Sequence, residues 1–340
     1  MKRNYYILQN GRLKREGNTI YFINKAIQNE ENANTSKIKK PIPVNDVDSL
    51  FVFGEVDLNT KLLDFLSQKK IPIHFFNYYG FYSGSYMPRE YLPSGFLLIN
   101  QVQHYLDSEK RIEIAKEFVL GASHNTLKNL IHYQKQKKEV KETIEMIKKE
   151  MENVKNCKNR AELMGVEGRI KNAYYRSFEK ILREGFGLQK RIKQPPDNMI
   201  NCLISFGNSL LYTVCLSEIF HTQLNPTISF LHEPGERRYS LSLDLAEIFK
   251  PVIVDKVIFK LVNNRMLEEK HFLKELNFCY LNERGKRLFL ENFDQRLQMV
   301  INHPKLKRPL SYRSLIRQEC YKLIKHLIGE EKYQSFKMWW

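Results

Sequence analysis

Two prolines and a glycine interrupt the chain within the stretch Pro88-Arg89-Glu90-Tyr91-Leu92-Pro93-Ser94-Gly95. Proline lacks the backbone N–H that helices and sheets use, so such a cluster is typical of a domain boundary. Before it, short runs of β-branched and aromatic residues predict strands; after it, apolar residues recur at helical spacing. We therefore expect an α+β protein, with a small β-rich domain at residues 1–92 and a larger, all-helical domain at residues 93–340.

Two hairpins are predicted in the first domain. The first turns at Glu16-Gly17-Asn18, and the second turns at Asn77-Tyr78-Tyr79-Gly80 between residues 71–76 and 81–87. Residues 58–68 lie between the hairpins and carry apolar side chains at roughly helical spacing, which predicts a helix. Residues 24–40 are polar and rich in asparagine, and their lack of periodicity predicts a flexible loop.

Helices account for the rest of the expected fold. Val140, Ile144, Ile147, Met151 and Val154 form an apolar stripe, which predicts an amphipathic helix docked on the body of the domain. Residues 201–221 are apolar nearly all round and are expected to form a central helix. The other helices are expected at residues 108–120, 126–134, 167–183 and 242–249, the last stopped by Pro251.

The charge of the chain indicates a polyanionic partner. Its 340 residues include 55 Lys and Arg against 38 Asp and Glu, a formal net charge of +17. An excess of this size is most often found in proteins that bind nucleic acid. An acidic membrane surface, or a simple surplus of surface lysine, are the alternatives. Residues 1–90 hold 13 basic and nine acidic side chains, so most of the excess belongs to the helical domain.

The cysteines and the apolar segments indicate the cellular compartment in which the protein is expected. The five cysteines are odd in number and form no C-x-x-C pair, which favours free or buried thiols over a disulfide or zinc framework. No charged-then-apolar leader opens the sequence, and its longest apolar stretches fall short of the ~18 residues that span a bilayer. We expect a cytoplasmic protein that does not associate with a membrane.

Three places put acidic or imidazole side chains where a solvated charge is less expected: Glu167 between two glycines, His232 beside an apolar run, and the pair Asp244 and Glu247. Each has a structural alternative. Glu167 in the first turn of a helix would complement the helix dipole, and a histidine such as His232 is more often a core residue. Asp244 and Glu247, at i and i+3, resemble a capping box.

Taken together, these carboxylates and the imidazole form an oxygen-rich set of ligands. Such a set suits Mg²⁺ or Mn²⁺ better than zinc. In a chain of this charge, the fitting chemistry is cleavage or transfer of a phosphodiester. The sequence contains no phosphate-binding G-x-x-x-x-G-K-[ST] loop, no G-x-S-x-G elbow and no cysteine in a recognisable nucleophile context.

Around these residues the chain resembles the CRISPR-associated integrase family, the larger of the two core proteins that insert new spacers into CRISPR arrays. In the first domain the resemblance is carried by residues 53–58, 71–76 and 80–84. In the second it is carried by Gly165-Val166-Glu167-Gly168 and by the segment from Leu231-His232-Glu233 to Phe249-Lys250-Pro251. It implies an N-terminal β domain and a C-terminal helical domain. It also implies a metal-dependent DNA endonuclease and integrase, in which a 3′-hydroxyl attacks a phosphodiester of the repeat.

The resemblance also implies roles for particular residues and partners. Glu167, His232 and Glu247 match the ligands of a divalent ion, Mg²⁺ or Mn²⁺, and Asp244 matches an acidic neighbour of that ion; these four would be catalytic. The implied partners are double-stranded and branched DNA, a second copy of the chain in a homodimer, and a small ferredoxin-like CRISPR adaptation protein.

The basic residues suggest where DNA would bind. Arg237 and Arg238 lie between the two ligand segments, and Lys305, Lys307, Arg308 and Arg313 belong to a basic run at residues 303–325. Two other functions stay open at this point: a general DNA-repair nuclease acting on branched DNA, and a non-catalytic DNA-binding scaffold whose acidic residues are helix caps.

Overall fold

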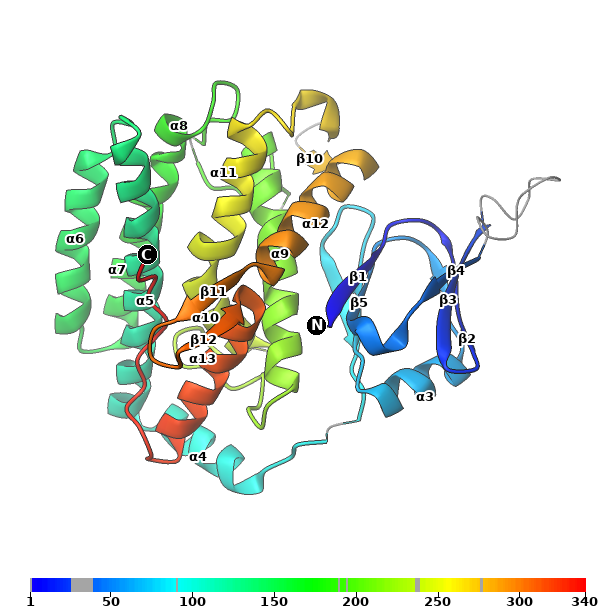
Figure 1. Cartoon of the computed structure of the whole chain (residues 1–340). Helices are drawn as coiled ribbons and strands as arrows, with labels where there is room; N and C mark the ends of the chain where they lie inside the picture. Colours follow the sequence, from blue (N-terminus) through cyan, green and yellow to red (C-terminus); the bar gives the residue numbers. More distant parts are fainter. Residues whose placement is uncertain are drawn as a thin grey trace. The chain divides into compact units, whose positions relative to one another are not determined.

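The computed structural model describes residues 2–25, 39–89, 91–188, 190–193, 195–235, 239–275 and 278–340. The chain divides into two compact units, Met1–Tyr91 and Leu92–Trp340 (Figure 1). The first unit ends beside the boundary expected at residue 92. The expected site residues Arg237 and Arg238 lie outside the described residues.

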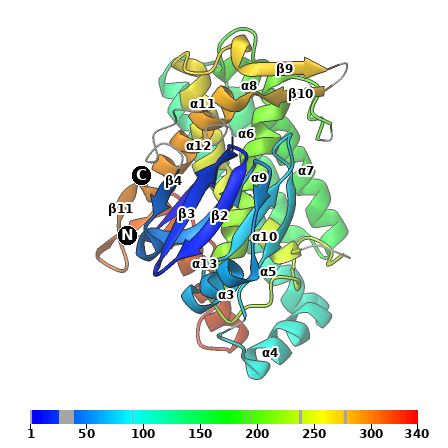
Figure 2. The ribbon, with the colours of Figure 1, turned by 90° about the vertical axis from the view of Figure 1, so that its right-hand side faces the viewer.

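The first unit contains two four-stranded sheets. The strand order of one sheet is β1-β5-β7-β8, in which β1 (Arg3–Ile7), β5 (Val47–Val52) and β7 (Ile73–Phe76) are parallel and β8 (Tyr82–Tyr86) is antiparallel. The strand order of the other is β4-β3-β2-β6, formed by β4 (Lys39–Ile42), β3 (Thr19–Asn24), β2 (Gly11–Glu16) and β6 (Val56–Asp57). Figure 2 shows β4, β3 and β2 side by side. A short 3₁₀ helix, η1 (Val44–Asp46), precedes β5.

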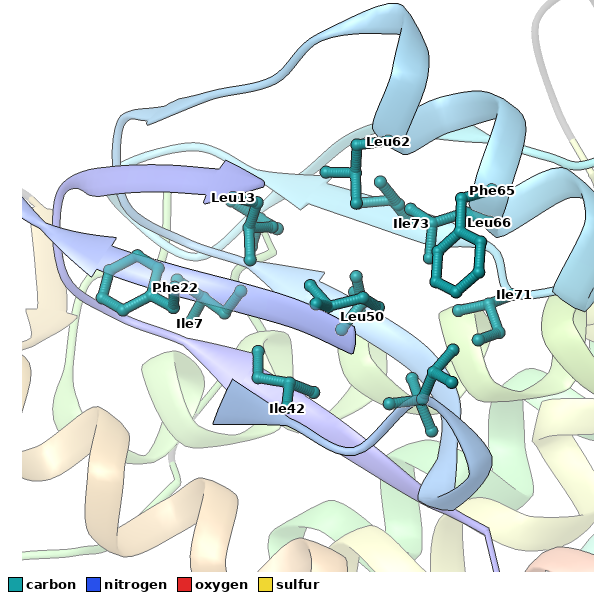
Figure 3. Close-up of a cluster of buried hydrophobic side chains, with 14 residues drawn as sticks. Ile7, Leu13, Phe22, Ile42, Leu50, Leu62, Phe65, Leu66, Ile71 and Ile73 are labelled. Carbon is teal, nitrogen blue, oxygen red and sulfur yellow. The ribbon is translucent and has the colours of Figure 1, made fainter. Parts of the chain in front are cut away.

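Both predicted hairpins are confirmed, as β2–β3 and β7–β8. Gly17 adopts a φ of 58° in the first turn, a conformation that costs glycine little. The predicted helix is α3 (Thr60–Lys69), and its residues Leu62 and Phe65 share one core with Leu13 and Leu50 of the two sheets (Figure 3). The loop expected at residues 24–40 falls largely on residues 26–38, which lie outside the described residues; β3 and β4 occupy its two ends.

The second unit is mostly helical, which confirms the predicted fold class. It also contains two hairpins, so the expectation of an all-helical domain was wrong in this detail. They pair β9 (Phe272–Glu275) with β10 (Phe278–Leu281), and β11 (Val300–His303) with β12 (Arg308–Ser311). The helices are α4 (Gly95–Leu106), α5 (Ser108–Lys135), α6 (Lys141–Asn156), α7 (Arg160–Arg176), α8 (Phe178–Ile181), α9 (Met199–Phe220), α10 (Ser240–Phe249), η2 (Lys250–Val254), α11 (Asp255–Asn263), η3 (Glu269–His271), α12 (Glu283–Gln298) and α13 (Tyr312–Leu327).

Helix α5 is one continuous helix where two were predicted. Gly121 lies inside it, and a Cβ added there would lie 2.5 Å from Ser335 Oγ, so glycine allows the segment after α13 to approach the helix. That segment is tied down along α5. Ser335 donates from its N–H and its hydroxyl to Glu117 Oε2, at 2.9 and 3.1 Å, and Met338 N–H donates to Asn125 Oδ1 at 2.8 Å.

Helix α9 forms the centre of the second unit. It packs against α10, α13 and η2, and nearly every one of its residues is buried. It is long and apolar enough to cross a membrane, but 78% of its most apolar window is buried within the protein, as in a core helix. The predicted apolar stripe on α6 is also buried at Ile144, Ile147 and Val154. All five cysteines are free and buried.

Candidate active site

Helix α7 places Glu167 in the interior. The helix begins after Asn159, whose side-chain oxygen accepts a hydrogen bond from Glu162 N–H at 2.9 Å. Glu167 therefore lies in the middle of the helix and not in its first turn, so the helix-dipole explanation for this residue was wrong. Its carboxylate is buried on the helix face that packs inward. A buried carboxylate needs a cation or hydrogen-bond donors, and this one contacts Lys171 one turn further along α7.

Asp244 organises the loop that carries His232. It is fully buried on α10. Because α10 begins at Ser240, Asp244 lies a full turn inside the helix, so the capping-box alternative for Asp244 and Glu247 was wrong. Its two oxygens accept hydrogen bonds from the backbone N–H groups of Phe230, Leu231 and His232 at 2.7, 2.9 and 3.0 Å. Its Oδ1 also contacts His232 Nδ1 at 2.8 Å.

The bond at Nδ1 fixes the direction of the imidazole. With Nδ1 engaged by Asp244, Nε2 is the ring nitrogen left to face Glu247, whose Oε1 lies 3.8 Å away. A carboxylate that holds one histidine nitrogen while the other faces a ligand position is the usual arrangement behind metal-binding histidines. Asp244 is therefore a positioning residue for His232, and it does not compete for the place that Nε2 faces.

Glu233 anchors the same loop from its other side. Its carboxylate forms ion pairs with Arg111 Nη2 at 3.1 Å and with Arg160 Nη2 at 2.7 Å. It also accepts a hydrogen bond from the hydroxyl group of Tyr105 at 2.8 Å. These partners come from α4, α5 and α7, so one side chain ties the loop to three helices. The hydrogen bonds from Tyr105 and Arg111 hold the pKa of Glu233 below its usual value, although burial opposes them.

Glu247 is buried between two lysines. Lys250 Nζ lies 2.6 Å from Glu247 Oε1, and Lys171 Nζ lies 2.9 Å from Glu247 Oε2. Burial alone would raise the pKa of this carboxyl, but the charges of Lys171 and Lys250 outweigh it and hold the pKa well below the usual value. Glu247 is therefore ionised at neutral pH, and both lysines are held in their charged forms.

A π-helical turn brings Lys250 to this position. Helix α10 ends at Phe249, as predicted, but Pro251 does not break the helical path, because the chain continues through η2 into α11. Proline cannot donate a backbone hydrogen bond, and the wider turn accommodates it. Two asparagines of α5 satisfy carbonyl groups here: Asn125 Nδ2 donates to Ile248 O at 2.9 Å, and Asn129 Nδ2 donates to Pro251 O at 2.8 Å.

Glu167, Lys171, Glu247 and Lys250 line a common pocket, together with Tyr175 and Asp255. Burial raises the pKa of Tyr175 to about 12. Burial also raises the pKa of Asp255 to about 7, although Tyr174 donates a hydrogen bond to its carboxylate at 3.0 Å. The pocket thus combines the ionised carboxylate of Glu247 and the ammonium groups of Lys171 and Lys250 with a phenol that keeps its proton.

The side chains fit a divalent ion by chemistry but are not arranged around one. Within the described part of the chain, no three Asp, Glu, His or Cys side chains lie close enough together to hold a metal. Glu167 Oε1 is buried and contacts the Lys171 ammonium group, so a cation already engages this carboxylate oxygen. Glu167 and Glu247 therefore both contact the Lys171 ammonium group, and His232 Nε2 lies 3.8 Å from Glu247 Oε1.

The expected DNA-binding residues separate into two groups. Lys305, Lys307 and Arg308 are exposed at the turn between β11 and β12. Arg313 is not on the surface: its side chain is only 9% exposed, and its guanidinium contacts the buried carboxylate of Glu218 at 2.5 Å. The expectation that Arg313 contacts DNA was therefore wrong, because a buried ion pair holds the charge.

The sequence reasoning missed Lys171, Lys250 and Glu233. The signal for the two lysines was present, because Lys171 follows Glu167 at i+4 and Lys250 follows Glu247 at i+3, the spacings at which helical side chains meet. For Glu233 no local pattern exists, since Arg111 and Arg160 lie far away in the sequence.

Solved structures of other proteins share this fold. The structure of a Cas1 protein from Thermotoga maritima matches with a TM-score of 0.85 at 42% sequence identity, covering 99% of this chain and 100% of that chain. A casposase bound to its integration product shares the fold, with a TM-score of 0.84 at 22% identity over 98% of this chain and 93% of that chain.

The family follows from the sequence comparisons. The model of the family "CRISPR associated protein Cas1" matches residues 5–295. A CRISPR-associated endonuclease Cas1 of Thermodesulfovibrio yellowstonii is 54% identical over 338 residues, covering 99% of this chain and 100% of that protein. The chain therefore belongs to the Cas1 family, and the resemblance stated from the sequence motifs is confirmed.

Proposed function

We propose that this protein is a metal-dependent DNA endonuclease and integrase that inserts new spacer DNA into CRISPR arrays. In the proposed reaction a 3′-hydroxyl of the incoming DNA attacks a phosphodiester of the repeat; hydrolysis is the same displacement with water as nucleophile. The new phosphodiester bond forms as the bond to the leaving oxygen breaks, so no oxidant or reductant is required.

One observation carries this proposal. Glu167 on α7 and Glu247 on α10 line one pocket, and His232 Nε2 lies 3.8 Å from Glu247 Oε1, in an orientation that Asp244 fixes through Nδ1. A scaffold protein would have no use for buried carboxylates and an oriented imidazole, since each costs free energy to desolvate. The naming of the relatives as endonucleases, and the casposase structure with its integration product, support the same class of reaction.

We propose Glu167, Glu247 and His232 Nε2 as the groups that would hold Mg²⁺ or Mn²⁺. Oxygen-rich ligand sets prefer these ions. When bound, the ion would supply a Lewis acid for the scissile phosphate and the leaving oxygen. The chain itself contributes the orientation of the imidazole through Asp244, and the positive charge of Lys250 beside the pocket.

The proposed partners follow from family membership and charge. They are double-stranded and branched DNA, a second copy of the chain, and the small ferredoxin-like CRISPR adaptation protein. Lys305, Lys307 and Arg308 are the proposed phosphate contacts among the described residues, because they are exposed and adjacent in the fold.

An integration assay tests the proposal. Purified protein, its small partner, a short DNA duplex and a repeat-bearing plasmid are combined with Mg²⁺, with Mn²⁺ or with EDTA. We expect the wild type to join DNA only with a divalent ion, and His232→Ala to lose strand transfer at least about 100-fold while still binding DNA. The matched control is His132→Ala, an exposed histidine near the end of α5.

The outcomes separate the competing functions. Full strand transfer by His232→Ala, or transfer that EDTA leaves unchanged, would contradict the metal-site assignment. A non-catalytic scaffold would bind DNA and cleave none. A general repair nuclease would process branched DNA with no preference for the repeat.

A further inference from the structure

A single ammonium group links the two carboxylates of the candidate metal site. Lys171 Nζ lies 2.9 Å from Glu247 Oε2 and also contacts Glu167 Oε1. These two glutamates belong to different helices, α7 and α10, and neither reaches the other directly in the described contacts. Lys171 thus occupies the point on which both carboxylates converge.

The second lysine of the site differs from Lys171 in its freedom to move. Lys250 is held on the π-helical turn, only 9% of its side chain is exposed, and its Nζ lies 4.9 Å from the centre of the Tyr212 ring. By contrast, 33% of the Lys171 side chain is exposed. A lysine has a flexible four-carbon stem, so Lys171 can withdraw its charge towards solvent without moving the backbone. The side chain of Lys250 is almost completely buried, so its ammonium group has much less solvent nearby.

A divalent ion and the Lys171 ammonium need the same two oxygen atoms. Mg²⁺ requires ligand oxygens at about 2.0–2.1 Å, closer than the ammonium approaches Glu247. A second cation at the same place would be repelled by the first. We propose that Lys171 is the built-in occupant of the cation position, and that the divalent ion binds by displacing it. This inference rests on the proposed metal site.

The displacement has two measurable consequences. Without metal, Lys171 neutralises buried carboxylates, so replacing it with an uncharged residue lowers the melting temperature in EDTA. With metal, the competing charge is gone, so the variant binds the ion more tightly than the wild type. The competition gives an expected gain of about tenfold in affinity, in the range of typical coupling between two ligands.

The test measures Mn²⁺ binding to the full chain without DNA, by the loss of the electron paramagnetic resonance signal of free Mn²⁺. Lys171→Met keeps the length of the stem and removes the charge, and Lys171→Arg keeps the charge. Arg169→Met is the matched control, since Arg169 also lies on α7 and pairs with Glu150 away from the pocket. Thermal unfolding in EDTA and in excess Mn²⁺ accompanies each titration.

We expect Lys171→Met to bind Mn²⁺ about tenfold more tightly than the wild type, with a lower melting temperature in EDTA that Mn²⁺ restores. Lys171→Arg and Arg169→Met should bind as the wild type does. Lys171→Gln replaces Lys171→Met if the latter does not fold. Unchanged or weaker binding by the neutral variant, with normal binding by the wild type, would overturn this inference alone. An absence of Mn²⁺ binding in every protein would overturn the metal site as well.

Discussion

Asp244 shows how one buried carboxylate can set the geometry of a site that it does not enter. Three consecutive backbone N–H groups and an imidazole nitrogen all point at it. A loop that offers three donors to one carboxylate cannot rotate without leaving buried donors unsatisfied, which costs about 1–3 kcal/mol for each group. The position of His232 Nε2 is therefore determined by α10 rather than by the loop.

Asp255 gives the pocket a dependence on pH. Burial raises the pKa of Asp255 to about 7 in the folded protein, from an ordinary value of 3.8. A carboxyl group with a raised pKa stabilises the fold while it is protonated, and this contribution is full below pH 4 and is lost as the pH rises towards 7. The loss amounts to as much as about 4 kcal/mol.

We therefore predict that Asp255→Asn removes a fall in the free energy of unfolding between pH 4 and pH 7. The amide cannot ionise, and its oxygen can still accept the hydrogen bond from Tyr174. Urea denaturation of both proteins in EDTA across this pH range measures the difference. The control is Asp64→Asn, which makes the same change of charge at an exposed site on α3. Parallel pH profiles for wild type and Asp255→Asn would contradict the prediction.

At the scale of elements, α10, η2 and α11 form one path through the core. The wide turn at Pro251 leaves carbonyl groups without helical partners, and α5 provides amides for Ile248 and Pro251. Asn129 also donates to the hydroxyl of Tyr174 at 3.0 Å, which in turn donates to Asp255. The turn that carries Lys250 is therefore held by another helix.

We predict that Asn129→Ala destabilises the protein by about 1–3 kcal/mol, because the buried carbonyl of Pro251 and the buried hydroxyl oxygen of Tyr174 both lose the amide that donates to them. Asn156→Ala, an exposed asparagine at the end of α6, should change stability by less than about 0.5 kcal/mol. Denaturant unfolding followed by circular dichroism measures both. Equal stabilities for the two variants would mean that the turn at Pro251 does not depend on α5.

The sequence predicted the type of most elements better than their ends. Most strands of the first unit, both early hairpins and the central helix follow from local composition and period, whereas β9 to β12 were not predicted. Helix α7 was predicted to begin seven residues too late, because the asparagine cap at Asn159 precedes a weakly apolar stretch. Two helices were expected at residues 108–120 and 126–134, but α5 is continuous through residues 121–125, and in the turn after α10 Asn129 donates to the carbonyl of Pro251.

The sequence identified the candidate site residues but not the side chains that each of them contacts. Glu167, His232, Asp244 and Glu247 were all singled out, and the fold brings them to one region. Their distinct roles depend on tertiary contacts: whether Asp244 caps a helix or holds an imidazole cannot be told from an i, i+3 spacing. The same holds for Arg313, which is basic in the sequence but paired with Glu218 in the core.

At the scale of the whole molecule, the net charge is +17, but not every basic side chain is available to a partner, because some are held in ion pairs. In the basic run at residues 303–325, Arg313 and Arg317 pair with Glu218, and Lys322 pairs with Glu319. The exposed turn between β11 and β12 keeps Lys305, Lys307 and Arg308 available to a polyanion.

We predict that replacing Lys305, Lys307 and Arg308 together with alanine weakens DNA binding and flattens its dependence on salt. Each lost phosphate contact lowers the slope of log affinity against log salt by about 0.9. Fluorescence anisotropy with a DNA duplex over a range of salt concentrations measures the slope. The control removes Lys137, Lys138 and Lys141 near the start of α6. Equal slopes for the two triple variants would contradict the proposal that DNA phosphates contact the β11–β12 turn.

The segment that follows α13 bears on the order in which the molecule is assembled. Met338 N–H bonds to Asn125, 213 residues earlier, and the same side chain supports the carbonyl of Ile248 beside Glu247. Contacts of such sequence separation form late in folding, and synthesis proceeds from the N-terminus. On the ribosome, the helix that carries Glu247 would receive this support only after residue 338 has emerged. The pocket of a nascent chain would thus gain this support only after the segment that follows α13 has been synthesised.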